Sequence, residues 1–236
     1  MLAAKAQSWV RERLGLDIVI LRCVLVDEHD TIEESGDAYL FTENLSDRTP
    51  LDGAWRDEEA ITAPMDERDR TAIRQWFTEQ REGGPPALQP WEYPGWFATA
   101  VEWIEATLPR TERLDQYATW SVSSLHRVAT TAGRCYFKAA PTAFRHEAAV
   151  TEMLGRRFPD AIPQPLAIDA ERGWMLTADF GDQLVATMEA PYWVGSLDAL
   201  ASLQRSSVAS VEFPARVRMP GSRTQDAGDS GGGTRH

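Results

Sequence analysis

Residues 133–154, GRCYFKAAPTAFRHEAAVTEML, decide the fold that the sequence predicts. The first part predicts a strand, and because side chains of a strand alternate between its two faces, Phe137 lies on one face and Lys138 on the other. The second part has helical spacing, expected over 143–158, and places Glu147 within an apolar stripe. A carboxylate in such surroundings needs a cation beside it, so we expect Lys138 and Glu147 to form an ion pair.

Lysine is rare in this chain. Of 24 basic side chains, Lys5 and Lys138 are the two lysines, and the other 22 are arginines. This skew is typical of GC-rich coding, which places arginine wherever any cation serves. A lysine in the middle of a strand therefore indicates a position where a planar guanidinium would not fit. The alternative is a solvated lysine on an edge strand.

Further short strands are predicted on both sides of this segment. The predicted strands cover 114–120, 125–130, 134–140, 166–169 and 174–178. A serine-rich turn over 121–124 separates the first two strands, and Ala132-Gly133 forms a tight hairpin turn. The order of three strands, one helix and two strands predicts a small antiparallel sheet with one helix packed on it.

The first 86 residues predict a separate acidic unit of mixed α and β structure. It contains a helix over 2–14, a strand over 16–26 buried on both faces, a partner strand over 38–42 and a helix over 66–81. An acidic turn over 27–37 joins the strands, and Gly83-Gly84-Pro85-Pro86 ends the unit. Because no catalytic side chains recur there at a recognisable spacing, we interpret the unit as an accessory domain.

Composition excludes several kinds of partner. The formal net charge is −12, and residues 1–100 hold 20 acidic but 10 basic side chains. Nucleic acid and anionic membrane surfaces need clustered cations, so neither is expected as a partner. No run approaches the ~18 apolar residues of a membrane span, and arginines near the N-terminus disfavour a signal peptide. The distant cysteines Cys23 and Cys135 suggest a reducing compartment, so we expect a cytoplasmic protein.

Five pieces of sequence between residues 120 and 203 carry a resemblance. They are 121–128 (SVSSLHRV), 136–139 (YFKA), 145–147 (RHE), 158–163 (FPDAIP) and 172–181 (RGWMLTADFG). In this order they resemble the N-terminal lobe of the aminoglycoside phosphotransferase and choline kinase-like family. That family is a branch of the protein-kinase-like fold, so the resemblance implies a kinase-like lobe.

The resemblance also implies ATP as the cofactor. It assigns to nucleotide binding Lys138, Glu147, Ser121, Ser123, Ser124, Thr177, Ala178 and Asp179. In the family, a lysine held by a glutamate faces the phosphates, a loop closes over them through backbone N–H groups, and the hinge backbone binds adenine. This chain has serines in the loop where the family has glycines, so we expect their hydroxyl groups to contribute.

The triplet Asp179-Phe180-Gly181 has the letters of the magnesium-binding triplet of protein kinases but not its position. The kinase triplet follows the catalytic loop, whereas Asp179 directly follows the last predicted strand. The resemblance therefore assigns Asp179 to the hinge, and no residue is assigned as a metal ligand.

The resemblance identifies missing parts as well. The family positions the acceptor hydroxyl and Mg²⁺ with an HGDxxxxN loop and a later Asp on a helical C-terminal lobe. None of the four histidines begins such a loop, so no catalytic residue is assigned. A helix over 191–208 would begin that lobe, and beyond Phe213 the periodicity stops. We expect 209–236 to be a disordered or out-of-frame tail.

The predicted fold class is therefore α+β, with the C-lobe missing. The predicted parts are an accessory domain over 1–86, a linker and helix over 87–112, a kinase-like N-lobe with its hinge over 113–208, and a tail over 209–236.

Three functional interpretations remain open. The first is a small-molecule kinase, truncated and impaired, whose family transfers the γ-phosphate of ATP to a hydroxyl of an aminoglycoside, sugar or amino alcohol. The second is a non-catalytic protein that binds nucleotide or a partner, and the third is an inert product of a disrupted gene. We also expect self-association, because a missing lobe would expose the apolar side of the helix over 191–208.

Overall fold

The computed structural model describes residues 2–25, 38–84, 88–181 and 189–208. The chain divides into two compact units, 1–183 and 184–236. No helix in the described ranges is long and apolar enough to cross a membrane. The acidic turn predicted over 27–37 and the tail predicted over 209–236 lie outside these ranges.

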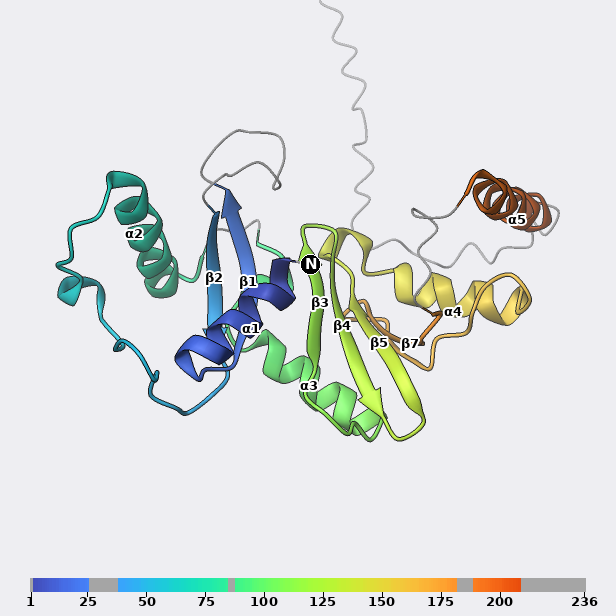
Figure 1. The fold of residues 1–236 in the computed structure, drawn as a ribbon. Coiled ribbons are helices and arrows are strands. Elements are labelled where there is room, and N and C mark those ends of the chain that lie inside the picture. The colour runs from blue at the N-terminus through green and yellow to red at the C-terminus, as the bar shows by residue number, and fades with distance from the viewer. Residues whose placement is uncertain (1, 26–37, 85–87, 182–188, 209–236) are drawn as a thin grey trace, which may run out of the picture. The chain divides into compact units, whose positions relative to one another are not determined.

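The first unit contains two antiparallel sheets (Figure 1). In the smaller sheet, β1 (Ile18–Leu25) pairs with β2 (Ala38–Asn44). The larger sheet has the strand order β3-β4-β5-β7-β6. Its strands are β3 (Asp115–Trp120), β4 (Ser123–Thr130), β5 (Gly133–Ala139), β6 (Ala167–Asp169) and β7 (Trp174–Ala178). The predicted α+β class and the predicted antiparallel sheet are confirmed.

The longer helices lie close to where their periodicity predicts them. They are α1 (Leu2–Leu14), α2 (Glu67–Glu82), α3 (Trp96–Thr107), α4 (Glu147–Arg157) and α5 (Ala190–Val208). Gly15 ends α1 with a φ of +66°, and its N–H donates to the carbonyl of Arg11 at 3.0 Å. Asp66 caps α2 by accepting a hydrogen bond from the backbone N–H of Asp69 at 2.9 Å.

One predicted helix is wrong at its start. The sequence predicts a helix over 143–158, but the structure has a 3₁₀ turn, Thr142–Phe144, before α4 begins at Glu147. The interruption coincides with a close backbone contact, because a Cβ on Gly173 would lie 2.7 Å from the Cα of Arg145. This contact comes from a distant hairpin turn, which local helical spacing does not encode.

The prediction that β1 is buried on both faces holds for only half of the strand. Residues Ile18 to Leu21 are all buried, whereas Cys23 is exposed. The pairing with β2 shifts register between Ile20 and Arg22, so β1 carries a bulge at this point. A continuous apolar run predicts a buried strand, but it does not show how far the covering layer extends.

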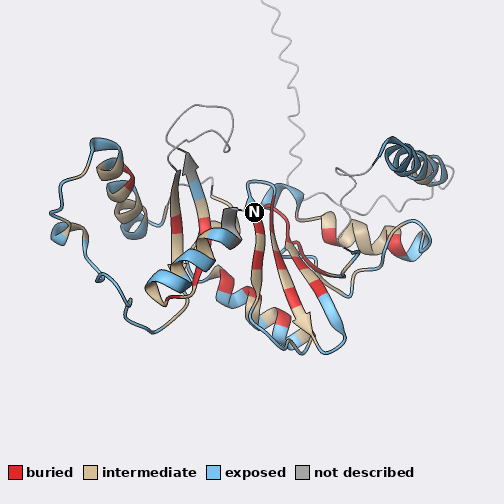
Figure 2. Ribbon diagram, in the orientation of Figure 1, coloured by how far each residue is buried: buried red, intermediate tan, exposed pale blue. Residues whose placement is uncertain are grey.

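The core of the larger sheet lies on the face toward α3. Figure 2 shows buried residues in both the strands and this helix. Alternation in β5 buries Phe137 and Ala139 on this face, and Ile104 of α3 packs in the same cluster. The buried members of this cluster are Trp91, Ala100, Ile104, Val128, Cys135, Phe137, Ala139, Trp174 and Leu176. The opposite face of β5 carries Tyr136 and Lys138, which are half-buried, as the alternation predicts.

A buried glutamine joins β1 to the larger sheet. Gln116 of β3 is 1% exposed, and its side-chain Nε2 donates to the carbonyl of Ile20 at 2.7 Å. Its Oε1 accepts from the backbone N–H of Ile20 at 2.8 Å, so the amide replaces a strand neighbour. Gln7 of α1 also donates to this Oε1 at 3.3 Å. The domain boundary near residue 86 stays a prediction, but these bonds join the two sides of it.

The polar chain continues from Gln116 into the aromatic core. Gln116 donates to Thr119 at 2.8 Å, the Thr119 and Ser124 hydroxyls lie 3.1 Å apart, and Ser124 bonds to Nε2 of His126 at 2.9 Å. Nδ1 of His126 has no hydrogen-bond partner in the described residues. The ring packs among aromatic side chains of Trp96, Phe97 and Phe137. Burial of this ring lowers the pKa of His126 to about 3.

We predict that Gln116→Leu destabilises the fold. Leucine preserves the apolar volume but leaves the N–H and carbonyl of Ile20 without partners, at a cost of about 2–4 kcal/mol of unfolding free energy. Urea denaturation measures this difference, and Gln75→Leu on the exposed side of α2 is the matched control. Equal stability of the two variants would show that the bonds to Ile20 contribute little.

We predict an acid-sensitive stability that depends on His126. The folded state keeps the imidazole neutral down to a pKa of about 3, whereas the unfolded chain protonates it near its ordinary value of 6.5. The unfolded state therefore binds more protons below that value, and this histidine lowers the unfolding free energy by about 2 kcal/mol at about pH 5. Urea denaturation at neutral and acidic pH should show this slope in His146→Gln and lack it in His126→Gln.

Candidate functional site

The candidate site lies on the face of the larger sheet opposite the aromatic core. Lys138 of β5 has Leu125 of β4 and Met175 of β7 as its cross-strand neighbours. Met175 is buried, and Leu125 is half-buried. The lysine side chain therefore emerges from apolar surroundings, which makes the solvated edge-strand interpretation a poor description of it.

The structure brings Lys138 and Glu147 together. Nζ of Lys138 donates to Oε1 of Glu147, and the two side chains are 32% and 35% exposed. The predicted pair is present, but the reason given for it is wrong. Glu147 is the first residue of α4 rather than a member of an apolar stripe. The helix dipole also stabilises a carboxylate in this first turn.

The serine-rich turn is shorter than predicted. Ser121 and Val122 form the turn and are exposed, whereas Ser123 and Ser124 already belong to β4 and are buried. The hydroxyl of Ser124 bonds within the core, to Thr119 and His126. Of the three serines predicted to bind nucleotide, Ser121 is therefore the one whose side chain faces solvent.

Strand register places this turn at the same end of β5 as Lys138. Ser124 pairs with Ala139, and Leu125 pairs with Lys138, so the β3–β4 turn lies just beyond the lysine. The predicted hinge lies toward the other end, because Ala178 pairs with Cys135. Cys135 and Lys138 are three positions apart in β5, a distance of about 10 Å along the strand.

Both oxygens of the Asp179 carboxylate accept hydrogen bonds at the hinge end. Its Oδ2 accepts from Arg134, and its Oδ1 accepts from the backbone N–H of Gly181 at 2.9 Å. The hydrogen bond from Arg134 holds the pKa of Asp179 below its ordinary value. Thr177 and Ala178, the other predicted hinge residues, are the last two residues of β7.

Sequence reasoning did not identify an aromatic and cationic row between these two ends. The guanidinium of Arg127 lies 4.3 Å from the ring centre of Tyr117 and forms an ion pair of 3.2 Å with Asp115. The ring of Tyr136 lies 6.0 Å from that of Tyr117. Alternation in 125–129 places Arg127 on the same face as Leu125, but the strand pairing that sets Arg127 beside Tyr136 comes from the structure.

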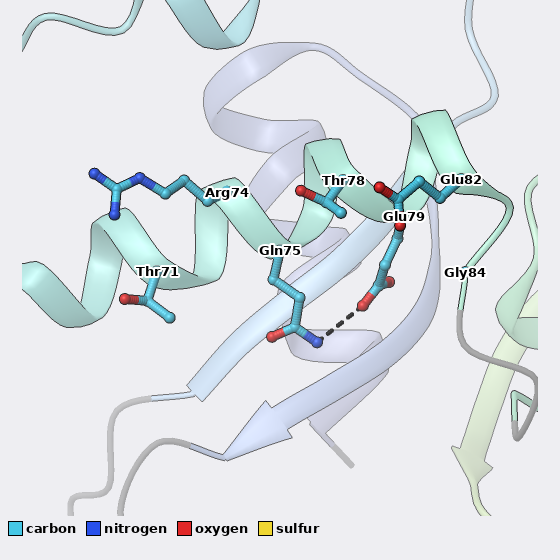
Figure 3. Close-up of a pocket in the computed structure, with 7 residues that line it drawn as sticks. All are labelled: Thr71, Arg74, Gln75, Thr78, Glu79, Glu82 and Gly84. Atoms are coloured by element: carbon cyan, nitrogen blue, oxygen red, sulfur yellow. Dashed lines mark hydrogen bonds between the residues drawn. The ribbon is translucent and has the colours of Figure 1, made fainter.

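A hollow of about 660 Å³ lies along α2, away from Lys138 (Figure 3). It is lined by Thr71, Arg74, Gln75, Thr78, Glu79, Glu82 and Gly84. Glu79 already forms an ion pair with Arg22 and accepts from Gln75 at 2.8 Å, while Arg74 pairs with Glu67. The charges of Glu79 and Arg74 are therefore paired within the fold.

In the parts of the chain that the structure describes, no three His, Cys, Asp or Glu side chains lie close enough together to bind a metal ion. Comparison with protein families, with curated proteins and with solved structures finds no match. The kinase resemblance therefore rests on the sequence pieces between residues 120 and 203 and on the geometry around Lys138.

Proposed function

We propose that this chain binds ATP on the Lys138 face of the larger sheet, as a kinase-like N-lobe. The observation that carries the proposal is the contact between Lys138 on the third strand and Glu147 at the start of the next helix. Protein kinases use a lysine on the third strand and a glutamate on the following helix in this way. The resemblance to the aminoglycoside phosphotransferase and choline kinase-like family supports the same function.

The spacing of the site supports a nucleotide as the ligand. The exposed turn at Ser121 and the ammonium of Lys138 share one end of β5, and the backbone of 177–179 lies toward the other end. Phosphates would lie at the first end, where turn N–H groups and one compact cation are available. Adenine would lie at the second end, where strand β7 finishes. The intervening ~10 Å is a suitable length for a nucleotide.

Each residue has a defined task in this proposal. Glu147 holds the ammonium of Lys138 in one orientation. The lysine then loses little further conformational freedom when it donates a hydrogen bond to a phosphate oxygen. Leu125 and Met175 flank the lysine and exclude water from its stem, which strengthens its attraction for an anion. Ser121 offers its hydroxyl, while Ser123 and Ser124 serve the sheet rather than the ligand.

The described residues do not fit the Mg²⁺ that the family uses. Both oxygens of Asp179 already accept hydrogen bonds, from Arg134 and from Gly181. Glu147 is neutralised by Lys138. The sequence also contains no HGDxxxxN loop to position an acceptor hydroxyl. We therefore propose nucleotide binding without phosphoryl transfer, with ATP bound weakly.

We predict a dissociation constant for ATP on the order of a millimolar, which corresponds to about −4 kcal/mol. Lys138→Ala should abolish the binding, and Lys138→Arg should weaken it, because a broad guanidinium fits the compact position poorly. NMR titration with ATP and Mg²⁺ measures the affinity. Lys5→Ala is the matched control, since it removes the chain's other lysine from an exposed helical position.

Two results would contradict this proposal in different ways. Equal ATP affinity in the Lys138→Ala and Lys5→Ala variants would remove the site from the Lys138 face. ADP release that depends on an aminoglycoside, sugar or amino alcohol and disappears in Lys138→Ala would show that phosphoryl transfer occurs. Because the Lys138–Glu147 pair is a third exposed, its loss should change the unfolding free energy by less than about 1 kcal/mol. We therefore expect Lys138→Ala to stay folded, so that a loss of ATP binding or of ADP release in this variant reports on the site itself.

We also propose self-association through α5. Its apolar side chains are exposed, among them Trp193 at 46%, Leu197 at 61% and Leu200 at 49%. These residues recur at helical spacing and form one apolar stripe, which a second copy of the same helix would cover. We predict oligomers at tens of micromolar chain by light scattering. Leu197→Glu should shift the protein toward monomer, whereas Asp198→Asn should not, and a monodisperse wild-type monomer would contradict the proposal.

A further inference from the structure

A pocket of about 280 Å³ lies where α3, the 3₁₀ turn before α4 and the β6–β7 turn meet. It is lined by Pro90, Trp96, Thr99, Thr142, Arg145, Glu171, Arg172 and Trp174. Trp174 pairs with Ala139 in β5, whose side chain lies on the face opposite Lys138. The pocket is therefore separate from the proposed ATP site.

Two tryptophans line the pocket. The rings of Trp96 and Trp174 lie edge to face, with their centres 5.8 Å apart and their planes at 87°. Trp174 is 3% exposed and belongs to the aromatic core, so its position is held from behind. Rigid indole rings favour a planar apolar ligand, because little conformational entropy is lost when such a ligand packs on them.

Arg145 lines the pocket without a charged partner among the described residues. Its side chain is half-buried, and its guanidinium forms no ion pair or hydrogen bond with any described residue. The backbone of Arg145 cannot withdraw easily, because it is packed against Gly173, where a Cβ would lie 2.7 Å from the Cα of Arg145. A partly desolvated and unpaired guanidinium favours an anion, above all a carboxylate that matches its fork.

The other charges around the pocket select for a singly charged anion. Arg172 is already paired with Asp169 at 3.0 Å and lies 5.0 Å from the Trp174 ring centre, so its charge is largely satisfied. Glu171 adds a negative charge to the lining. Glu171 and Asp169 repel any anion here, and they repel a doubly charged phosphate about twice as strongly as a carboxylate, so the single positive charge of Arg145 suits the carboxylate better.

We propose that this pocket binds a small planar carboxylate, with its ring against Trp96 and Trp174 and its carboxylate on Arg145. The volume of about 280 Å³ lies just below the range of sites for drug-sized ligands and suits a single ring. The hydroxyl of Thr142 also lines the pocket and can donate to the second carboxylate oxygen, whereas that of Thr99 already donates to the carbonyl of Gly95 at 3.3 Å. This proposal does not depend on ATP binding.

Fluorine NMR of 4-fluorobenzoate with the full chain tests the proposal. We expect saturable binding in the millimolar range or tighter, and at least tenfold weaker binding of the neutral analogue 4-fluorobenzamide. Arg145→Gln should weaken the binding of the carboxylate at least tenfold. Arg156→Gln, which removes an exposed arginine from α4, should leave it unchanged.

A second variant fixes the location of the ligand. Thr142→Trp fills the pocket from an exposed position without changing its charge, so it should also abolish binding. Absence of saturation, equal affinity for the acid and the amide, or equal affinity of Arg145→Gln and Arg156→Gln would each overturn the proposal. Unchanged binding in Thr142→Trp would overturn it as well, even where Arg145→Gln fails to fold.

Discussion

The hydrogen bonds between Gln116 and Ile20 are the constraint on which the rest of the first unit depends. Both strands are irregular here, since β1 shifts register between Ile20 and Arg22 and β3 shifts between Gln116 and Ala118. Two bulged strands cannot pair continuously through their backbones. A side-chain amide carries a donor group and an acceptor in one plane. Gln116 therefore forms hydrogen bonds to both backbone groups of Ile20 with a single side chain. The buried apolar residues of β1 thereby gain a fixed place beside the larger sheet.

The two faces of β5 carry different chemistry because the side chains of a strand alternate. One face holds Phe137 in the aromatic core, and the other holds Lys138 beside Glu147. The segment between β5 and α4 contributes to both faces. Arg145 lines the pocket beside Trp174, and two residues later Glu147 reaches the lysine. The tight contact with Gly173 fixes this segment, so the proposed carboxylate pocket and the proposed ATP site depend on one backbone conformation.

Local signals predicted the regular elements well and the interruptions poorly. Gly15 and Asp66 mark helix ends because their preferences act within one turn, and the hairpin at Gly133 follows from its own backbone freedom. The break before α4 was missed because a contact from the β6–β7 turn overrides residues that are compatible with a helix. The serine turn was predicted too long because Ser124 belongs to β4, where its hydroxyl bonds within the core to Thr119 and His126. The Lys138–Glu147 pair was predicted correctly from a premise about α4 that was wrong.

The sequence by itself determined most of the elements, their order along the chain and the faces of β5, because periodicity and turn preference act over a few residues. It also singled out Lys138 through the scarcity of lysine. Tertiary structure alone decided that Gln116 would bridge to β1, that Arg127 would lie over Tyr117, and that Arg145 would line a pocket without a partner. The physical reason is that these contacts join residues separated by many positions or by several strands. Which residues become partners depends on which surfaces pack together, and that packing depends on the apolar area buried over the whole unit.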